Sequence, residues 1–383
     1  MHIHPKITPI YQTSVFKFED LNELELYFGE PGSRYLYSRN GNPNSDELAE
    51  AVNRLEGGAG AVATGSGMAA IFAAVLTYCV AGDHVLCAAD IYGGSAALLN
   101  QELERLGIGV TYVPFEDLTA NLAPYARPRT RLLLCETISN PLLRVVDLQA
   151  AAAAAHALGV KLVVDNTFAS PVLTNPLAFG ADLVMHSVTK YLAGHSDVTA
   201  GAVVARTPED AARLKQIGTL FGLTLSPMES WLAVRGLKTL RLRMNAHCYN
   251  AQAVAELLTQ HPAVAEVFYP GLPTHAQHHL ASEQGAGRFG GMVSFRLADD
   301  SVEAVNRFMR GSQRFPFAPS LAGVDSSSSY PAGTSHRALS EEQRQQLGIT
   351  AGLVRLSVGI EPVAELLTDI EQALGATSSG NGG

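Results

Sequence analysis

The stretch KLVVDNTFASPVLTNPLAFGADLVMHSVTK, residues Lys161 to Lys190, contains two apolar segments that each end in polar residues. The first apolar segment, Lys161–Val164, is followed directly by Asp165, and the second, Asp182–Met185, is followed by a loop that ends at Lys190. Short apolar runs bounded by polar residues are typical of buried strands. A carboxylate directly beyond a buried strand is costly unless a partner compensates its charge, so Asp165 indicates a ligand or a partner at that end.

The same pattern of short apolar runs separated by helical stretches extends on both sides of this stretch. Strands made almost entirely of apolar residues and joined by helices are typical of a mostly parallel sheet that is covered on both faces. We therefore predict an α/β protein whose large domain contains a mostly parallel, seven-stranded sheet. The strands are predicted at Gly60–Ala63, His84–Cys87, Gly109–Val113, Arg131–Cys135, Lys161–Val164, Asp182–Met185 and Gly201–Val204. The helices are predicted at Leu48–Leu55, Met68–Tyr78, Ala96–Leu106 and Leu148–Leu158.

The sequence pattern divides the chain into four segments. Residues 1–43 lack sustained periodicity and are predicted to form an arm, residues 44–240 hold the sheet, residues 241–376 form a smaller α+β domain, and residues 377–383 form a disordered tail. Strong helical character continues after the sheet through Pro208–Leu220 and Pro227–Gln260. In the smaller domain we predict strands at Met292–Arg296 and Val354–Val358, helices at Val302–Met309 and Ala364–Ala373, and a loop at Ser326–Ser329.

Composition argues against several kinds of partner and location. The 383 residues are 47% hydrophobic and 16% charged, and the net charge of −9 leaves no basic surface for a nucleic-acid backbone. No apolar stretch is long enough to span a membrane, and the N-terminus lacks the apolar core of a signal peptide. The four cysteines are scattered without CxxC spacing, which is typical of buried thiols in a cytoplasmic protein. The histidines His275, His278 and His279 fit an exposed helix start, so we predict no metal site.

Ligands of an open α/β sheet bind at the carboxyl ends of its strands. At that edge we expect the glycine turn Thr64–Ala70, whose backbone N–H groups suit a phosphate at a helix start, together with Asp165, Ser187, Thr189 and Lys190. Pyridoxal phosphate (PLP) requires an amine for a Schiff base, an acid against its ring nitrogen, and donors for its phosphate. The sequence therefore predicts a PLP enzyme in which Lys190 is the cofactor lysine and Asp165 is the partner of the ring nitrogen.

Other interpretations of the same residues exist. Lys190 alone could be a solvated surface charge, and Asp165 alone could cap a helix through its side chain. The segment Gly65-x-Gly67-x-x-Ala70 also matches a dinucleotide-binding fingerprint, with Asp90 further along the chain, which would indicate an oxidoreductase. That alternative leaves Asp165 and the lysine loop unexplained. A catalytically inactive binding protein is a third possibility, and an absorption spectrum distinguishes all three.

The chain resembles the Cys/Met-metabolism group of PLP-dependent enzymes, which includes cystathionine γ-synthases, cystathionine γ-lyases, methionine γ-lyases and O-acylhomoserine sulfhydrylases. The resemblance rests on eight segments in the order of that family and covers nearly the whole chain. These segments are YSRNGNP (Tyr37–Pro43), SGMAAI (Ser66–Ile71), DIYGGS (Asp90–Ser95), ETISNP (Glu136–Pro141), VDNTFASP (Val164–Pro171), SVTKYLAGHSDV (Ser187–Val198), RGLKTLRLRM (Arg235–Met244) and LVRLSVGIE (Leu353–Glu361).

The resemblance implies fold type I of PLP-dependent transferases and a role for each matching residue. Lys190 and Tyr92 would be catalytic, Lys190 as the shuttling acid and base and Tyr92 as an acid or base that also stacks on the ring. Arg355, Asn140 and Ser320 would bind the substrate carboxylate. The cofactor would be held by Lys190, Asp165, Tyr92, Ser66, Gly67, Met68, Ser187 and Thr189, and by Tyr37 and Arg39 from the arm of a neighbouring subunit. The family usually forms tetramers built from dimers that share active sites.

The reaction that the resemblance implies is cleavage of a carbon–sulfur bond by γ- or β-elimination on a cystathionine-, homocysteine- or methionine-like substrate. The alternative is γ-replacement on an O-acylhomoserine. Departures from relatives leave the substrate open: Leu36 stands where an acid is usual, Gly94 stands where methionine γ-lyases tend to have cysteine, and Ala322, Asp325 and the run Ser326–Ser329 replace other residues of the distal loop.

Overall fold

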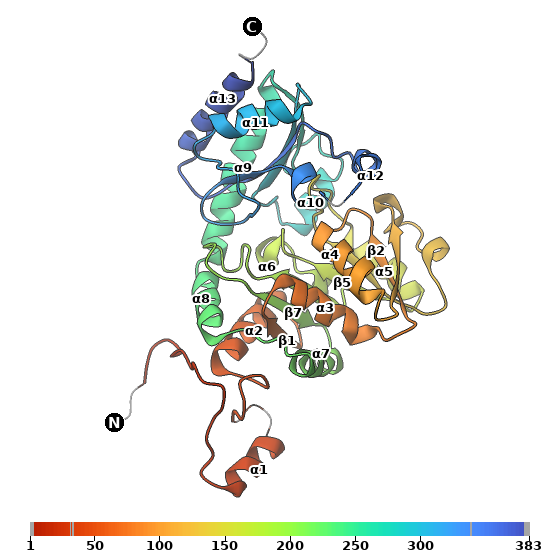
Figure 1. Ribbon diagram of the computed structural model, residues 1–383, viewed down its shortest axis with the longest axis vertical. Coiled ribbons are helices and arrows are strands. Elements are labelled where there is room, and N and C mark those ends of the chain that lie inside the picture. Colours follow the sequence, from red (N-terminus) through yellow and green to blue (C-terminus); the bar gives the residue numbers. More distant parts are fainter. Residues whose placement is uncertain (1–3, 31, 33, 338, 379–383) are drawn as a thin grey trace.

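The computed structural model describes residues 4–30, 32, 34–337 and 339–378. A central sheet has the strand order β1-β7-β6-β5-β4-β2-β3 (Figure 1), and only β7 runs antiparallel to its neighbours. The prediction of a seven-stranded, mostly parallel sheet is confirmed. The strands are β1 (Gly60–Thr64), β2 (His84–Ala88), β3 (Gly109–Val113), β4 (Thr130–Glu136), β5 (Lys161–Asp165), β6 (Leu183–Ser187) and β7 (Gly201–Ala205).

Helices cover both faces of this sheet because alternate residues of each strand point to opposite faces. The main covering helices are α2 (Pro43–Glu56), α3 (Gly67–Tyr78), α5 (Leu148–Ala157), α7 (Pro208–Leu220) and α8 (Pro227–Leu237). Val164 of β5 and Val184 of β6 are buried in one cluster with residues of α2, α5 and α8. Val163 and Leu183, one position away, are buried with residues of α3 and α7. Each strand therefore has a face toward α2 and a face toward α3.

A second sheet lies in the C-terminal part of the chain. Its antiparallel strands have the order β10-β11-β9-β8 and span Val264–Phe268 (β8), Met292–Leu297 (β9), Ser327–Ser329 (β10) and Leu353–Ser357 (β11). The helices packed on it are α9 (Leu240–Gln260), α11 (Val302–Gly311) and α13 (Val363–Ser378). Phe295 of β9 and Phe308 of α11 are fully buried in the shared core, with ring centroids 5.3 Å apart.

Helix α9 connects the two sheets (Figure 1). In its first turn, the Arg243 guanidinium donates a hydrogen bond to the carbonyl of Tyr191 at 2.7 Å. In the next turn, the His247 ring bonds the carbonyl of Val358 at 2.6 Å, just beyond β11. The same helix thus holds the loop that carries Lys190 and the end of a strand from the C-terminal sheet.

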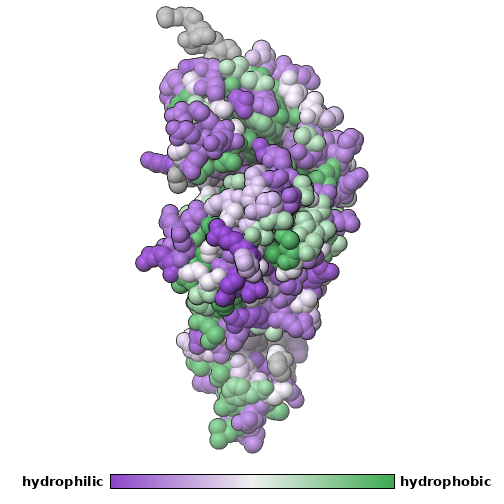
Figure 2. Space-filling model, turned by 90° about the vertical axis from the view of Figure 1, so that its right-hand side faces the viewer, coloured by the Kyte–Doolittle hydropathy of each residue, from purple (hydrophilic) through white to green (hydrophobic). Residues whose placement is uncertain are grey.

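The N-terminal arm leaves the body of the molecule ahead of α2 (Figure 1). Its base is held by the buried Asn44, whose side chain accepts from the backbone N–H of Tyr11 at 2.8 Å and donates to the carbonyl of Pro9 at 2.9 Å. Further along, helix α1 (Leu21–Gly29) contains no buried residue, and its Leu21 is 77% exposed. Figure 2 shows hydrophobic residues on the surface of this lower end of the molecule, and exposed apolar surface of this kind is typical of a protein–protein contact.

Several observed helices differ from the predicted ones. The helix predicted at Leu48–Leu55 begins at Pro43, because the Asn42 side chain caps it and proline fits a first turn. Helix α1 was not predicted, because its nine residues are too few to establish a sustained helical pattern in the sequence. The region Pro227–Gln260 contains two helices, α8 and α9, which are separated at Lys238.

The serine run is also corrected by the structure. Ser327–Ser329 forms strand β10 and not a loop, because its backbone pairs with β11. Helix α13 continues to Ser378, so the first two residues of the predicted disordered tail are helical, and the remaining residues, 379–383, lie outside the described residues. Within the described part of the chain, no helix combines the length and the apolar character needed to cross a membrane. The helix predicted at Ala96–Leu106 begins earlier, as α4 (Gly93–Ala97), and continues into a π-helical turn at Leu98–Leu103. Other short α-helices are α6 (Ser170–Leu173), α10 (His278–Gln284) and α12 (Glu341–Gln346).

Candidate active site

A cavity of about 600 Å³ lies between the carboxyl ends of the central strands and the C-terminal part of the chain. The structure brings ten of the predicted site residues to this one cavity, namely Ser66, Gly67, Met68, Tyr92, Asn140, Asp165, Ser187, Thr189, Lys190 and Arg355. The C-terminal part contributes Pro319, Leu321, Gly333, Thr334, Ser335, Arg337 and Arg355. Residues from the central sheet and from the C-terminal part of the chain are therefore both needed to form the cavity.

One end of the cavity is formed by the N-terminus of α3. Ser66 caps this helix, with its hydroxyl accepting from the N–H of Ala69 at 3.1 Å. A side chain at Gly67 would lie 2.8 Å from the Cβ of Ser187, so the absence of a side chain lets the loop approach β6 closely. Thr189 is fixed nearby by the backbone of Ala200, 3.0 and 3.1 Å from its hydroxyl. Free helix N–H groups beside two hydroxyls are suited to a phosphate.

Asp165 ends strand β5 at the floor of the cavity. Its Oδ1 accepts a hydrogen bond from the N–H of Thr167 at 2.9 Å, and the Thr167 hydroxyl accepts from the N–H of Ser187 at 2.8 Å. Burial raises the pKa of the Asp165 carboxyl, while Thr167 and, more weakly, His186 oppose this shift. A buried carboxylate that faces a cavity is best satisfied by a cationic N–H donor, such as a protonated pyridine nitrogen.

Lys190 lies on the loop after β6 and is half-buried. Its Nζ lies 3.5 Å from the hydroxyl of Ser320. Burial, assisted by the Arg355 guanidinium, lowers the pKa of the Lys190 amine. A lowered pKa increases the fraction of neutral amine, which is the form that attacks a carbonyl carbon.

Arg355 and Glu136 organise the wall between the two sheets. Arg355 is buried and donates to the Asn140 side-chain oxygen at 2.7 Å, while its Nε has no hydrogen-bond partner among the described residues. Burial lowers its pKa to about 10, so the group remains charged at neutral pH. Glu136 accepts from the N–H groups of Tyr92 at 3.2 Å and Asn140 at 3.3 Å. Burial, together with the charges of Asp165 and Asp90, raises the Glu136 pKa.

Tyr92 stands beside the C-terminal loop that contains Ser335. A side chain at Gly93 would collide with the Ser335 carbonyl, so glycine permits this loop to close against the start of α4. A side chain at Gly94 would collide with the Tyr92 ring. The cysteine found in some relatives at this position would therefore require a different placement of Tyr92.

Two predicted cofactor residues lie elsewhere in the chain. Tyr37 and Arg39 are on the arm, Tyr37 is 43% exposed, and neither lines the cavity of its own chain. The Arg39 guanidinium lies 5.8 Å from the centre of the Tyr37 ring and donates to the carbonyl of Thr219 at 3.0 Å. A contribution from these residues to an active site would thus come from another copy of the chain.

Sequence reasoning missed several residues of the cavity. Glu136 ends strand β4 as Asp165 ends β5, so the signal of a carboxylate after a buried run was present for both. Arg337 gave no such signal, because it belongs to an irregular loop. The distal loop also differs from expectation: among the described residues that line the cavity it contributes Pro319 and Leu321, whereas Asp325 and the serine run do not line it.

Comparisons with known proteins agree with this geometry. Residues 2–375 match the family described as Cys/Met metabolism PLP-dependent enzyme. The chain is 44% identical to the cystathionine beta-lyase of Lactococcus lactis subsp. cremoris, over 96% of this chain and 93% of the relative. It is 42% identical to the L-methionine gamma-lyase of Pseudomonas deceptionensis, over 97% of this chain and 92% of the relative. The crystal structure of cystathionine gamma synthase from Xanthomonas oryzae pv. oryzae in complex with cystathionine superimposes with a TM-score of 0.90 at 42% identity, covering 97% of this chain and 93% of that chain.

Proposed function

This chain belongs to the family of Cys/Met metabolism PLP-dependent enzymes, and we propose that it is a carbon–sulfur lyase of sulfur amino acid metabolism. The reaction is γ- or β-elimination on a cystathionine-, homocysteine- or methionine-like substrate, which yields a 2-oxo acid, ammonia and a thiol. The observation that carries the proposal is the convergence of Lys190, Asp165 and the N-terminus of α3 on one cavity. These groups match the three chemical needs of pyridoxal phosphate.

The residues of the cavity have distinct roles in this proposal. Bound pyridoxal phosphate supplies the electron sink that stabilises negative charge on the substrate α-carbon. Asp165 would hold the ring nitrogen, and the phosphate would be held by Ser66, Gly67, Met68, Ser187 and Thr189. Lys190 would bind the cofactor covalently at rest, and its amine, once displaced by the substrate amine, would remove the α-proton and later return a proton to the product side. Its lowered pKa supports the basic role.

The substrate is oriented by groups on the opposite wall. Arg355 binds the α-carboxylate as a two-pronged donor, and Asn140 holds the guanidinium in place through their 2.7 Å hydrogen bond. Ser320 assists from beside Lys190. Tyr92, whose backbone N–H is held by Glu136, would cover the ring and transfer a proton near the leaving group.

The charge of the cavity favours cystathionine over methionine as the substrate. Arg337 adds a second guanidinium to the wall formed by the C-terminal loop. Cystathionine carries a second carboxylate at its far end, and a guanidinium is the side chain best suited to bind it. Methionine ends in an uncharged thioether and gains nothing from this charge.

The close alternative is γ-replacement, in which an O-acylhomoserine loses its ester and a thiol adds. Its support is the likeness to the Xanthomonas oryzae synthase, at a TM-score of 0.90 and 42% identity. Elimination and replacement share the same early proton transfers. They differ in the later steps: in elimination, water releases the product as a 2-oxo acid, whereas in replacement a second substrate, the thiol, adds to the bound intermediate.

We also propose a homotetramer built from dimers that share active sites. The exposed apolar side chains of the arm and the position of Tyr37 and Arg39 outside their own cavity support this arrangement. A cytoplasmic location is supported by Cys79, Cys87 and Cys135, which are buried free thiols of the kind that persist in reducing compartments.

An absorption spectrum of the purified protein tests the proposal. We expect a visible absorption band from the lysine-bound cofactor. Borohydride reduction should attach the cofactor permanently to Lys190. The Lys190→Ala variant should show neither the band nor any turnover. The protein is then incubated with L-cystathionine, L-methionine, L-homocysteine or O-acetylhomoserine. A 2-oxo acid released without added thiol identifies a lyase, whereas product that forms only with a thiol identifies the replacement reaction. A cofactor-treated protein with no visible band, or a Lys190→Ala variant with normal turnover, would contradict the proposal.

A further inference from the structure

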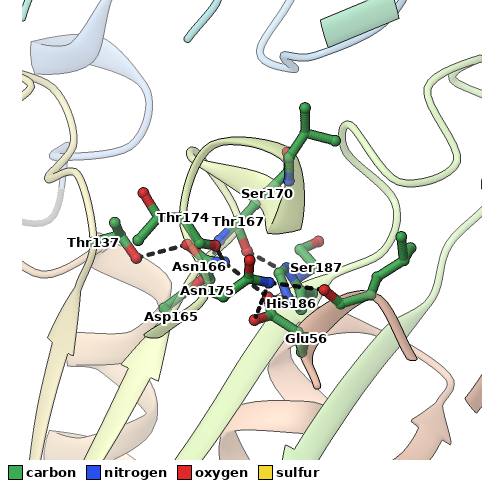
Figure 3. Close-up of polar contacts among 12 residues, drawn as sticks. Glu56, Thr137, Asp165, Asn166, Thr167, Ser170, Thr174, Asn175, His186 and Ser187 are labelled. Atoms are coloured by element: carbon green, nitrogen blue, oxygen red, sulfur yellow. Dashed lines mark hydrogen bonds and ion pairs between the residues drawn. The ribbon is translucent and has the colours of Figure 1, made fainter. Parts of the chain in front are cut away.

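A buried hydrogen-bond network lies behind the floor of the cavity, on the face of the sheet that α2 covers (Figure 3). Its centre is Glu56, the last residue of α2, whose side chain has no exposure to solvent. Glu56 Oε1 accepts from the His186 ring at 2.7 Å and from the Asn166 amide at 2.8 Å. Its Oε2 accepts from Asn175 at 3.3 Å. His186 and Asn166 are also fully buried.

The network reaches the ends of adjacent strands of the sheet. Asn166 follows β5, and His186 is the next-to-last residue of β6. The hydroxyl of Thr137, which follows β4, donates to the Asn166 side-chain oxygen at 2.7 Å. The network thereby connects β4, β5 and β6 at the edge where the cavity lies (Figure 3).

Three residues of the network are direct neighbours in the sequence of residues that line the cavity. Thr137 follows Glu136, Asn166 follows Asp165, and His186 precedes Ser187. Because successive side chains of a strand point to opposite faces, fixing one member of each pair fixes the direction of the other. Asp165 and the Ser187 hydroxyl are therefore oriented by contacts that their neighbours make on the opposite face of the sheet.

We infer that Glu56 is a positioning residue of the cofactor site, which holds the ends of β5 and β6 so that Asp165 and Ser187 face the same ligand. This inference rests on the proposed function, since it concerns pyridoxal phosphate binding. Glu56 does not line the cavity, and among the described residues its side-chain hydrogen bonds go to His186, Asn166 and Asn175. Its effect passes through His186 and Asn166, and a buried carboxylate with two strong donors is a rigid anchor.

The opposing view is that Glu56 only stabilises the fold, as any buried and bonded carboxylate does. Asp369 of α13 provides the matched control. It is also buried, and it accepts from the Ser312 hydroxyl and from the N–H of Gln313 at 2.7 Å, in the C-terminal core far from the cofactor groups. A purely structural role predicts the same behaviour for Glu56→Ala and Asp369→Ala.

The experiment measures the dissociation constant of pyridoxal phosphate by absorption titration, and the melting temperature of each apoprotein. We expect Glu56→Ala to raise the dissociation constant by about 10-fold or more, the equivalent of one lost charge-assisted hydrogen bond. Asp369→Ala is expected to lower the melting temperature to a similar extent but to leave the dissociation constant within about 2-fold of wild type. Glu56→Gln keeps the Oε1 acceptor for His186 and Asn166, so it should restore most of the affinity.

A second pair of variants avoids any loss of folding. Thr137→Val removes the hydroxyl donor to Asn166 without a change of shape, and Thr130→Val makes the same change at the opposite end of β4, where Thr130 bonds His84. We expect the dissociation constant to rise about 3-fold for Thr137→Val and to stay unchanged for Thr130→Val.

Equal cofactor affinity in Glu56→Ala and wild type, or equal losses in Glu56→Ala and Asp369→Ala, would overturn the positioning role. The proposed reaction is judged separately, on the 2-oxo acid that the wild-type enzyme releases. A wild type that binds pyridoxal phosphate but releases no product would refute the reaction and still permit the comparison of affinities.

Discussion

Arg355 and Arg337 line the same cavity in different surroundings. Arg355 is buried and held by Asn140, as a group that binds an invariant part of the substrate should be. Arg337 is exposed, and within the described part of the chain its guanidinium has no hydrogen-bond or ion-pair partner. A flexible, uncompensated charge at the wall can serve the variable end of a substrate.

The Arg337→Gln variant tests this difference at a single residue. We expect KM for L-cystathionine to rise about 10-fold, since a charge-assisted hydrogen bond to the distal carboxylate is lost. KM for L-methionine should stay within about 2-fold, because methionine has no charge at that end. Steady-state kinetics with both substrates provides the comparison.

Arg344→Gln is the matched control for this measurement. Arg344 lies on α12 in the same region, donates to the Leu339 carbonyl at 2.8 Å, and does not line the cavity. It should change neither KM. Equal rises for both substrates in Arg337→Gln would show that the loop, and not the charge, had been disturbed.

At the scale of elements, the packing of α9 and of the loop after β10 depends on neutral histidines. His247 and His336 are both buried, and burial lowers the pKa of each to about 4, against about 6.5 in the unfolded chain. The charge of Arg243 lowers the pKa of His247 further, whereas the hydrogen bond of the His247 ring to the Val358 carbonyl raises this pKa. Arg355 adds to the shift of His336.

These histidines should make the fold sensitive to acid. Between pH 6.5 and 4 the unfolded chain binds protons that the folded histidines reject, so stability falls as the pH falls through that range. Each fully buried histidine accounts for roughly 3 kcal/mol across this range. Urea unfolding at pH 7 and pH 5 should show a smaller loss for His247→Gln than for wild type. An identical loss in both would exclude His247 as the cause.

A helix or strand could be predicted only where its burial produces a recognisable pattern of apolar residues in the sequence. The strands of the central sheet are short apolar runs, and the structure places a strand at every predicted position. Strand β8 (Val264–Phe268) has two exposed positions, and β10 contains only serines, so only pairing with β9 and β11 defines them. Helix α1 buries nothing within its own chain.

The site could be predicted to a similar degree and for similar reasons. Asp165 ends the buried strand β5 and Lys190 lies on the loop after β6, so both positions could be inferred from the apolar runs that precede them in the sequence. Glu56 was not detectable, since an acidic residue at the end of an amphipathic helix usually faces solvent. Its burial is decided by His186, 130 positions away in the chain.

At the scale of the whole molecule, the role proposed for the arm would require a second copy of the chain. Tyr37 and Arg39 lie outside the cavity of their own chain, on a segment whose apolar side chains are exposed. If a neighbouring subunit supplies them, every active site combines Lys190 of one chain with Arg39 of another. A closed symmetric dimer would then contain two such sites.

Mixing Arg39→Ala subunits with Lys190→Ala subunits tests this sharing. Random pairing makes half of the dimers hybrids, and each hybrid has one intact site, so we expect activity to return to about a quarter of the wild-type level. The readout is turnover after joint unfolding and refolding, with each variant refolded alone as the control. Hybrids with no more activity than the separate variants would mean that each site is built from a single chain.

Helix α9 has a consequence for how the molecule comes apart. Because one continuous helix is bonded through Arg243 to the loop that carries Lys190, and through His247 to the end of β11, neither half can lose its structure without breaking contacts of the other. Calorimetry should therefore record a single cooperative melting event for the two halves, with no partly folded species in between. Proteases in a cell would therefore encounter this chain either fully folded or fully unfolded.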